Sequence, residues 1–193
     1  PEPRGAESVV VTAARVAQPL SEVIGSVSVI TRQDIERRAV QSVQDLLPGV
    51  TRLSVTNTGG FGKLSNVFLR GTDAEQVLVL IDGVRVGSVS SGTASLEFLP
   101  VDQIERIEII RGPRSSLYGS DAIGGVIQIF TRRSDAPSFS AGVGSNDTST
   151  ASASFGSSSD NAWVSLAANQ IRSEGYNSCA GSPEGGGCFT NEP

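Results

Sequence analysis

The sequence predicts an α+β domain with a small mixed sheet and short helices, followed by the first strands of a transmembrane antiparallel β-barrel. Strand-like and helix-like segments are interspersed between residues 20 and 131, and Pro and Gly separate them. After residue 133 the pattern changes to alternation of apolar residues with Ser, Gly and Asn. Such alternation is typical of barrel strands, which face lipid on one side and a polar interior on the other.

The N-terminal residues contain two β-prone runs. Residues 1–7 are expected to be disordered, and "SVVVTA" at 8–13 is a β-prone run with no partner nearby in the sequence. A second strand is expected at 26–30, "SVSVI".

Two short helices are predicted from their capping residues. Thr31 resembles an N-cap, with Asp34 three residues on, and it starts a helix that runs to about residue 39. Ser42 and Asp45 repeat the pattern. The second helix must end near Leu47, because Pro and Gly follow.

From residue 50 onward the hydrophobic period changes to two, which predicts a series of strands. Asp82-Gly83 is a strong hairpin-turn signal. Pro100 is expected to open a helical turn, and Pro113 to be the first residue of a short helix. The expected strands are 50–54, 66–71, the two arms of the hairpin 76–86, 105–112 and 124–131.

Three further strands are expected at 138–145, 150–157 and 161–170. Each has one apolar face and one face of small or polar residues. The apolar positions are Phe139, Ala141, Val143, Ala151, Ala153, Phe155, Ala162, Val164, Leu166 and Ala168. Three strands cannot close a barrel, and an open edge in lipid leaves backbone groups unpaired. We therefore expect the natural protein to continue for many more strands.

The composition disfavours several classes of function. The net charge of −5 argues against a nucleic-acid surface. The absence of His removes the commonest general base and metal ligand, so we expect no enzyme. The two cysteines, Cys179 and Cys188, are too few for a structural zinc site, and they predict a disulfide or, alternatively, two reduced surface thiols.

The glycine-rich stretch at 111–130, "RGPRSSLYGSDAIGGVIQIF", does not match the glycine-containing motifs of phosphate-binding, dinucleotide-binding or catalytic-serine sites. It contains no lysine for a phosphate-binding loop and no G-x-G-x-x-G spacing. It also lacks G-x-S-x-G, and there is no His to activate a serine. The glycines are therefore expected to supply turns and close backbone approaches.

This stretch instead resembles the C-terminal signature of the plug domain of TonB-dependent outer-membrane receptors. "SVSVITRQDIERR", "SVQDLLPGV", "NVFLRG" and "VLVLIDGVRV" resemble other plug motifs, in the same order, and "VVVTA" resembles a TonB box. Within that family the motifs look most like those of cobalamin receptors, and ferric-siderophore receptors are the alternative. A surface binding module without a barrel is a more distant alternative.

The resemblance implies three parts: a TonB box and flexible segment at 1–19, a plug domain at 20–133, and the first barrel strands with an extracellular loop at 134–193. The TonB box would add a strand to a sheet of TonB, although an ordinary edge strand of the domain is the simpler alternative. Its residues would be Glu7, Ser8, Val9, Val10, Val11, Thr12 and Ala13.

The resemblance also implies roles for plug residues. Arg70 and Arg111 match plug arginines that pair with barrel glutamates, or they are simply solvated arginines at strand ends. The ligand would contact external plug loops, whose mostly uncharged character suits an amide-bearing corrinoid. The ligand-contacting residues would be Lys63, Leu64, Ser65, Asn66, Asp73, Val89, Ser90, Ser91 and Thr93.

As a family member, the protein would lie in the outer membrane of a Gram-negative cell, with its plug facing the periplasm. Its partners would be TonB, cobalamin and outer-membrane lipid, and a monomer is expected. Trp163 would join the interfacial aromatic girdle, and the Cys179–Cys188 disulfide would lie in the extracellular loop. We expect no cofactor or metal in this chain. Calcium would bind in barrel loops to which no residue of this chain can be matched.

Overall fold

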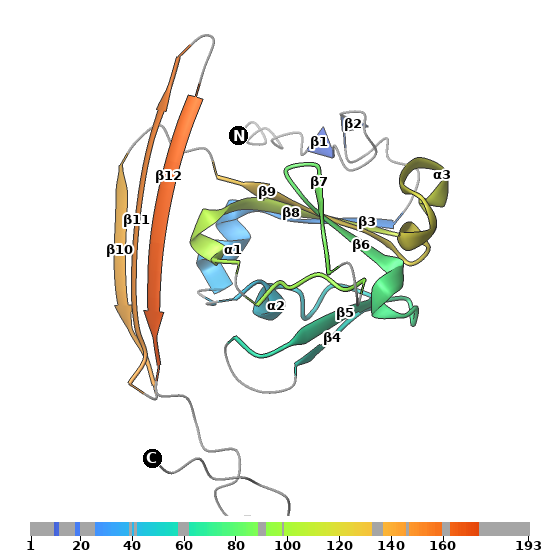
Figure 1. Ribbon diagram of the computed structural model, residues 1–193, viewed down its shortest axis with the longest axis horizontal. Helices are drawn as coiled ribbons and strands as arrows, with labels where there is room; N and C mark the ends of the chain where they lie inside the picture. Colours follow the sequence, from blue (N-terminus) through green and yellow to red (C-terminus); the bar gives the residue numbers. More distant parts are fainter. Residues whose placement is uncertain are drawn as a thin grey trace, which may run out of the picture.

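The computed structural model describes most of the chain between residues 26 and 173, together with two short N-terminal segments. The described residues are 10–11, 18–19, 26–38, 40, 42–57, 62–88, 92–97, 99–132, 137–145, 147–159 and 163–173. Figure 1 shows a mixed α+β domain with a separate sheet of long strands standing beside it. Below, residues 26–132 are called the N-terminal domain.

A five-stranded mixed sheet forms the centre of the N-terminal domain (Figure 1). Its strand order is β3-β8-β9-β6-β7. The pair β6/β9 is parallel, and the other neighbouring pairs are antiparallel. The predicted small mixed sheet is therefore confirmed. The strands are β3 (Ser26–Ile30), β6 (Val77–Ile81), β7 (Val84–Val86), β8 (Ile104–Arg111) and β9 (Gly125–Thr131).

The turn between β6 and β7 is the one that the sequence predicted. Asp82 and Gly83 both have positive φ, 47° and 83°, as a tight two-residue hairpin requires. The Asp82 carboxylate also accepts hydrogen bonds from the backbone amide and the hydroxyl of Thr131. The turn is thus attached to the last residue of β9, where the chain leaves the domain.

Short helices connect and cover the strands. They are α1 (Arg32–Arg38), α2 (Val43–Leu46), α3 (Ser115–Tyr118) and the 3-10 turns η2 (Ala74–Gln76), η3 (Val101–Gln103) and η4 (Ser120–Ala122). Pro100 precedes η3, as predicted. The prediction for Pro113 is wrong, because Arg114 is the N-cap of α3 and the proline lies one residue outside the cap.

The predicted cap of α1 is present. The Asp34 carboxylate accepts hydrogen bonds from the Thr31 backbone amide at 3.1 Å and from the Thr31 hydroxyl at 2.8 Å. In return the Asp34 amide donates to the Thr31 hydroxyl. The pKa of Asp34 is lowered below its usual value, mainly by the hydrogen bonds from Thr31. At α2, the Ser42 hydroxyl donates to Asp45, and Leu47 is the C-cap, so the helix ends near Leu47 as predicted.

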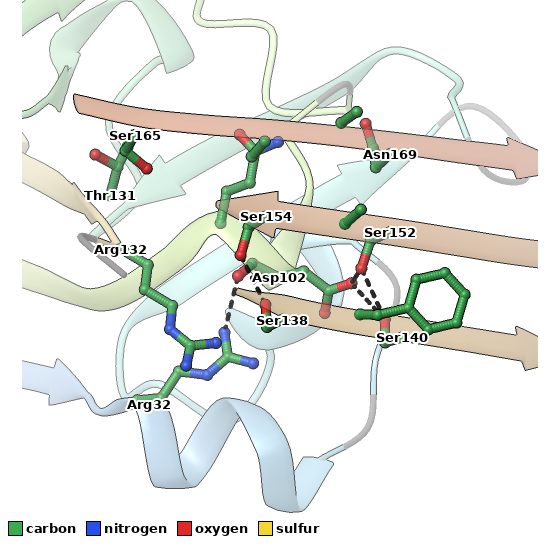
Figure 2. A pocket seen from close by; sticks show the side chains of 15 residues that line it. Arg32, Asp102, Thr131, Arg132, Ser138, Ser140, Ser152, Ser154, Ser165 and Asn169 are labelled. Atoms are coloured by element: carbon green, nitrogen blue, oxygen red, sulfur yellow. Dashed lines mark hydrogen bonds between the residues drawn. The ribbon is translucent and has the colours of Figure 1, made fainter. Parts of the chain in front are cut away.

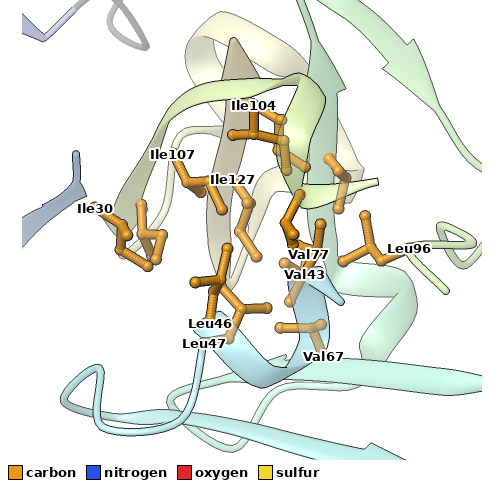
Figure 3. Close-up of a cluster of buried hydrophobic side chains, with 14 of the residues drawn as sticks. Ile30, Val43, Leu46, Leu47, Val67, Val77, Leu96, Ile104, Ile107 and Ile127 are labelled. Atoms are coloured by element: carbon orange, nitrogen blue, oxygen red, sulfur yellow. The ribbon is translucent and has the colours of Figure 1, made fainter. Parts of the chain in front are cut away.

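One hydrophobic cluster fills the space between the sheet and the segments below it (Figure 3). Alternate residues of β8 and β9, including Ile107 and Ile127, point into it. Leu46 and Leu47 enter from α2 and its C-cap, and both are fully buried. Burying a side chain of this size contributes roughly 1.5–3 kcal/mol, so this cluster holds the short helices in place.

A second hairpin closes the lower side of this core in Figure 1. It pairs β4 (Leu53–Asn57) with β5 (Ser65–Leu69) in antiparallel register. The first strand begins three residues later than the predicted 50–54. Arg52, inside the predicted strand, has a φ of 61°, which breaks extended structure there.

The N-terminal β-prone run is paired, contrary to the sequence prediction. β1 (Val10–Val11) pairs antiparallel with β2 (Gln18–Pro19), which lies seven residues further on. This two-stranded sheet is separate from the five-stranded one. The described part of the predicted TonB box is therefore not an edge strand of the central sheet.

The last three described strands form an antiparallel sheet beside the N-terminal domain (Figure 1). They are β10 (Ser138–Val143), β11 (Ser149–Ser158) and β12 (Trp163–Arg172), which confirms the prediction. The register pairs Phe139 with Ala153 and Phe155 with Leu166, so the apolar positions share one face. That face is open, with Phe139 77% and Val143 92% exposed. The described helices include none long and apolar enough to span a membrane.

Candidate functional site

The candidate functional segments lie at two ends of the molecule. In Figure 1, β1 lies at the upper end, while β4 and β5 lie at the lower end. β12 runs downward, toward the end that carries β4 and β5. The predicted partner-binding segment and the predicted ligand-binding loop are thus on opposite sides of the central sheet.

The first four predicted ligand contacts lie at the end of the loop before β5 and in the first two residues of β5. Lys63 is exposed, and so is Leu64, with 51% of its surface accessible. Asn66 is partly exposed. The prediction that Ser65 contacts the ligand is wrong, because Ser65 is only 1% exposed and begins strand β5, where alternate residues point into the core. Three of the four residues are therefore available to a ligand.

The remaining predicted ligand contacts lie close to this loop. Asp73 is exposed and caps the turn η2. Gly92 packs on the Glu75 side chain of the same turn, so the segment that holds Thr93 lies against it. Thr93 and Asn66 line one small cavity. Its volume of about 10 Å³ holds about one water molecule, so these residues form a surface rather than an enclosed pocket. Residues 89–91 lie outside the described residues.

The predicted plug–barrel arginines belong to a cluster of three. The Arg111 side chain donates from Nε to the Ser26 hydroxyl and from Nη1 to the Thr51 carbonyl, each at 2.9 Å. The Arg70 guanidinium lies on Gly112, the residue after Arg111. The Arg70 amide donates to the Arg52 carbonyl at 2.9 Å, which brings the third arginine to the group.

The electrostatics of this cluster are unfavourable on their own. The pKa of Arg111 is lowered by burial and then by the charges of Arg70 and Arg52. Arg111 is 7% exposed. Within the part of the chain that the structure describes, no carboxylate forms an ion pair with any of the three. Cations in this arrangement favour a nearby anionic partner.

A polar contact joins the N-terminal domain to the three-stranded sheet (Figure 2). Asp102, in η3, accepts a hydrogen bond from the Ser152 hydroxyl at 2.9 Å, and the Ser140 hydroxyl lies 3.4 Å from the same carboxylate oxygen. Beside it lies a cavity of about 420 Å³, lined in part by Arg32, Arg132 and serine hydroxyls of β10 and β11.

Several sequence predictions fall on residues that the structure does not describe. These are the Cys179–Cys188 disulfide, the side chain of Trp163, and Glu7, Ser8, Val9, Thr12 and Ala13 of the TonB box. Among the described residues, no cluster of three or more Asp, Glu, Cys or His side chains could hold a metal ion.

Sequence reasoning missed Asp102 and Arg52. The turn at 100–103 was predicted from Pro100, but nothing local indicates that an acid there meets a serine fifty residues later. For Arg52 the sequence carries no signal of a left-handed conformation, which non-glycine residues rarely adopt.

The comparisons with known proteins identify one family. The model of the TonB-dependent receptor plug domain matches residues 19–126, which is more than half of the chain.

Three solved structures illustrate the similarity. A mutant of the ferric enterobactin receptor PfeA from Pseudomonas aeruginosa, in complex with enterobactin, is 28% identical, with a TM-score of 0.53 over 69% of this chain and 22% of that chain. The siderophore receptor PirA from Acinetobacter baumannii is 26% identical, with a TM-score of 0.56 over 75% of this chain and 24% of that chain.

The alcaligin receptor FauA from Bordetella pertussis has a TM-score of 0.71 at 22% identity, over 86% of this chain and 29% of that chain. This last likeness shows the fold alone. The chain spans 22–29% of the length of these three receptors.

Proposed function

Because the chain belongs to the family of TonB-dependent receptor plug domains, we propose that it is the N-terminal part of a receptor that imports a nutrient complex with energy delivered through TonB. Receptors of this family are transporters rather than enzymes. They lie in the outer membrane, with the plug inside the barrel and facing the periplasm, and this is the location of the present chain. From here on, the N-terminal domain is called the plug.

The division of the three-stranded sheet into two faces is the observation that carries the proposal. The middle of its open face is apolar, with Phe139, Phe155 and Leu166 exposed, as expected of a lipid-facing surface, and Ser149, Ser157, Gln170 and Arg172 lie toward the ends of the same face. The face toward the plug carries Ser, Thr and Asn. A sheet with this polarity and a plug against its polar face matches a barrel wall around a plug.

For the cargo, we propose a ferric siderophore. Support comes from sequence similarity at 26–28% identity to receptors described as receptors for ferric enterobactin and siderophores. The exposed Lys63 amine fits this cargo, because ferric catecholates are anionic.

Cobalamin is the second candidate. Of the predicted ligand residues that the structure describes, only Lys63 and Asp73 are charged, and their charges are opposite. A surface that offers mainly amide and hydroxyl groups suits a large ligand that carries amides. The motif resemblance to cobalamin receptors favours the same cargo.

We also propose that Arg70 and Arg111 hold the plug through carboxylates of the barrel. The arginine cluster has its own hydrogen bonds to Ser26 and Thr51 but no counter-ion among the described residues. Paired carboxylates would remove the repulsion among the three cations. Bidentate guanidinium–carboxylate pairs would also fix the orientation of the plug.

Titration of the purified full-length receptor with ferric enterobactin, other ferric siderophores and cyanocobalamin tests the cargo. We expect saturable binding of one ferric siderophore, with a dissociation constant on the order of 1–100 nM, or about −10 to −12 kcal/mol. Exchange of Lys63 for Gln should weaken the binding of an anionic ferric siderophore, because it removes a cation from the ligand face.

The control in this titration is Lys63→Arg, which keeps the positive charge at the same position and should retain the binding of an anionic ferric siderophore. Calcium-dependent binding of cyanocobalamin alone would identify the second candidate as correct. If the folded receptor bound neither class of ligand, the proposed cargo would be wrong.

A further inference from the structure

We propose that the hydroxyl-bearing face of β10 and β11 is a docking surface for the plug, and that Asp102 is the residue that anchors the plug on it. The inference rests on the proposed function in one respect: it treats the three-stranded sheet as part of the barrel wall. The contact itself is independent of the cargo and of TonB.

The anchoring contact joins the Asp102 carboxylate to a pair of hydroxyls on the neighbouring strands β10 and β11. Ser152 donates to Asp102 Oδ2 at 2.9 Å, and Ser140 lies 3.4 Å from the same oxygen. Each hydroxyl has a single proton. The Ser152 proton goes to Asp102, and the Ser140 proton goes to the Ser152 oxygen, at an Oγ–Oγ distance of 2.7 Å. Hydrogen bonds to an ionised group are about twice as strong as neutral ones. Because its hydroxyl lies closer to the carboxylate, Ser152 makes the main contact, and Ser140 supports it.

The turn that carries Asp102 is held from three sides. Arg32 of α1 donates to the carbonyls of Val101 and Ile104, on either side of Asp102 in the chain, at 3.0 and 2.9 Å. Pro100 forms a β-bridge with Ser42, which precedes α2. Arg132, at the exit from β9, donates its amide to the Gln103 carbonyl at 2.7 Å. The carboxylate is thus positioned before it meets the sheet, which lowers the entropic cost of docking.

The face of the sheet that receives Asp102 is uncharged. By the strand register, the described residues on this face are Ser138, Ser140, Gly142, Thr150, Ser152, Ser154, Gly156, Ser165, Ala167, Asn169 and Ile171. Ser138 and Ser154 form a second hydroxyl pair at 2.6 Å, in line with the first. Arg32 and Arg132 line the adjoining cavity together with Asp102 (Figure 2).

The anchor is separate from the arginine cluster. Asp102 lies two residues before β8 begins, and Arg111 is the last residue of β8. Seven residue steps along a strand correspond to about 23 Å. The plug is therefore held at one end by a carboxylate on neutral hydroxyls, and at the other end by guanidinium groups. The first attachment lies beside Arg132, the first residue after β9.

The test is the frequency with which the full-length receptor opens in a planar lipid bilayer, without ligand and without TonB. Removal of the anchor should raise the frequency of openings. We expect about a tenfold increase for Asp102→Ala, and a smaller one for Asp102→Asn, which keeps one oxygen acceptor. Ser152→Ala should act like Asp102→Ala, and the double variant should add little to either single change, because the three variants remove the same contact.

Two substitutions serve as matched controls. Glu105→Ala removes an exposed acid three residues from the anchor, and Ser157→Ala removes a hydroxyl from the opposite face of β11. Both should leave the opening frequency unchanged. An unchanged frequency in Asp102→Ala, or fully additive effects of Asp102→Ala and Ser152→Ala, would overturn the anchor. Uptake by the wild-type receptor, measured in parallel, shows whether such a failure also concerns the proposed function.

Discussion

Replacement of Gly125 by alanine is expected to unfold the plug or to lower its stability by more than about 3 kcal/mol. Gly125 begins β9 with a φ of 153°, a conformation that residues with a side chain rarely adopt. A Cβ atom there would lie 2.2 Å from the Ile110 carbonyl oxygen and 2.8 Å from a methyl carbon of Leu69. The oxygen belongs to the backbone of the neighbouring strand, so it cannot move away without breaking the sheet.

The matched control is Gly83→Ala in the hairpin turn. Gly83 also has a positive φ, 83°, but a Cβ there would meet no atom within 4 Å. Its cost should therefore be limited to the backbone conformation, about 1–2 kcal/mol. The stability of both variants is measured as the urea midpoint of plug unfolding, monitored by pulse proteolysis of the detergent-solubilised receptor. Equal losses of stability would show that steric overlap at Gly125 is not the cause.

The second large effect is expected from proline in the predicted TonB box. A proline at Val10 or Val11 should reduce transport at least tenfold, while the affinity for the ligand stays within about twofold of the wild-type value. Proline has no amide proton and cannot donate to a partner's sheet, so strand addition to TonB should fail. β1 lies at the opposite end of the molecule from β4 and β5, so the ligand surface should be unaffected (Figure 1).

The control for this prediction is Val10→Ile, which keeps the β propensity and the amide donor. Uptake of radiolabelled ligand by intact cells, and equilibrium binding to isolated outer membranes, give the two quantities. The box assignment would be wrong if the proline variants transported normally. It would also be wrong if they lost ligand binding and transport together.

Features encoded by neighbouring residues could be predicted from the sequence. The cap of α1 requires only Thr31 and Asp34, and the β6–β7 hairpin requires only Asp82-Gly83 between two apolar runs. The alternation of the last three strands placed Phe139, Phe155 and Leu166 on one face, as the register shows. Each of these features depends on interactions within a few residues or on a simple period.

Features that depend on distant contacts could not be predicted. The partner of β1 is a strand of two residues that contains a proline, which is a weak strand signal. Ser65 reads as a loop residue, but the pairing of β5 with β4 turns it toward the core. The contact between Asp102 and Ser152 joins two parts of the fold that carry no sign of each other in the sequence.

The most direct test of the whole account is uptake of ferric siderophore by cells that carry the full-length receptor, with and without a proton-motive force. Surface binding is measured on the same cells. We predict that a protonophore, or the loss of TonB, abolishes accumulation in the periplasm and leaves surface binding intact. Accumulation that continues undiminished without TonB and without the proton-motive force would contradict a plug that must be pulled open.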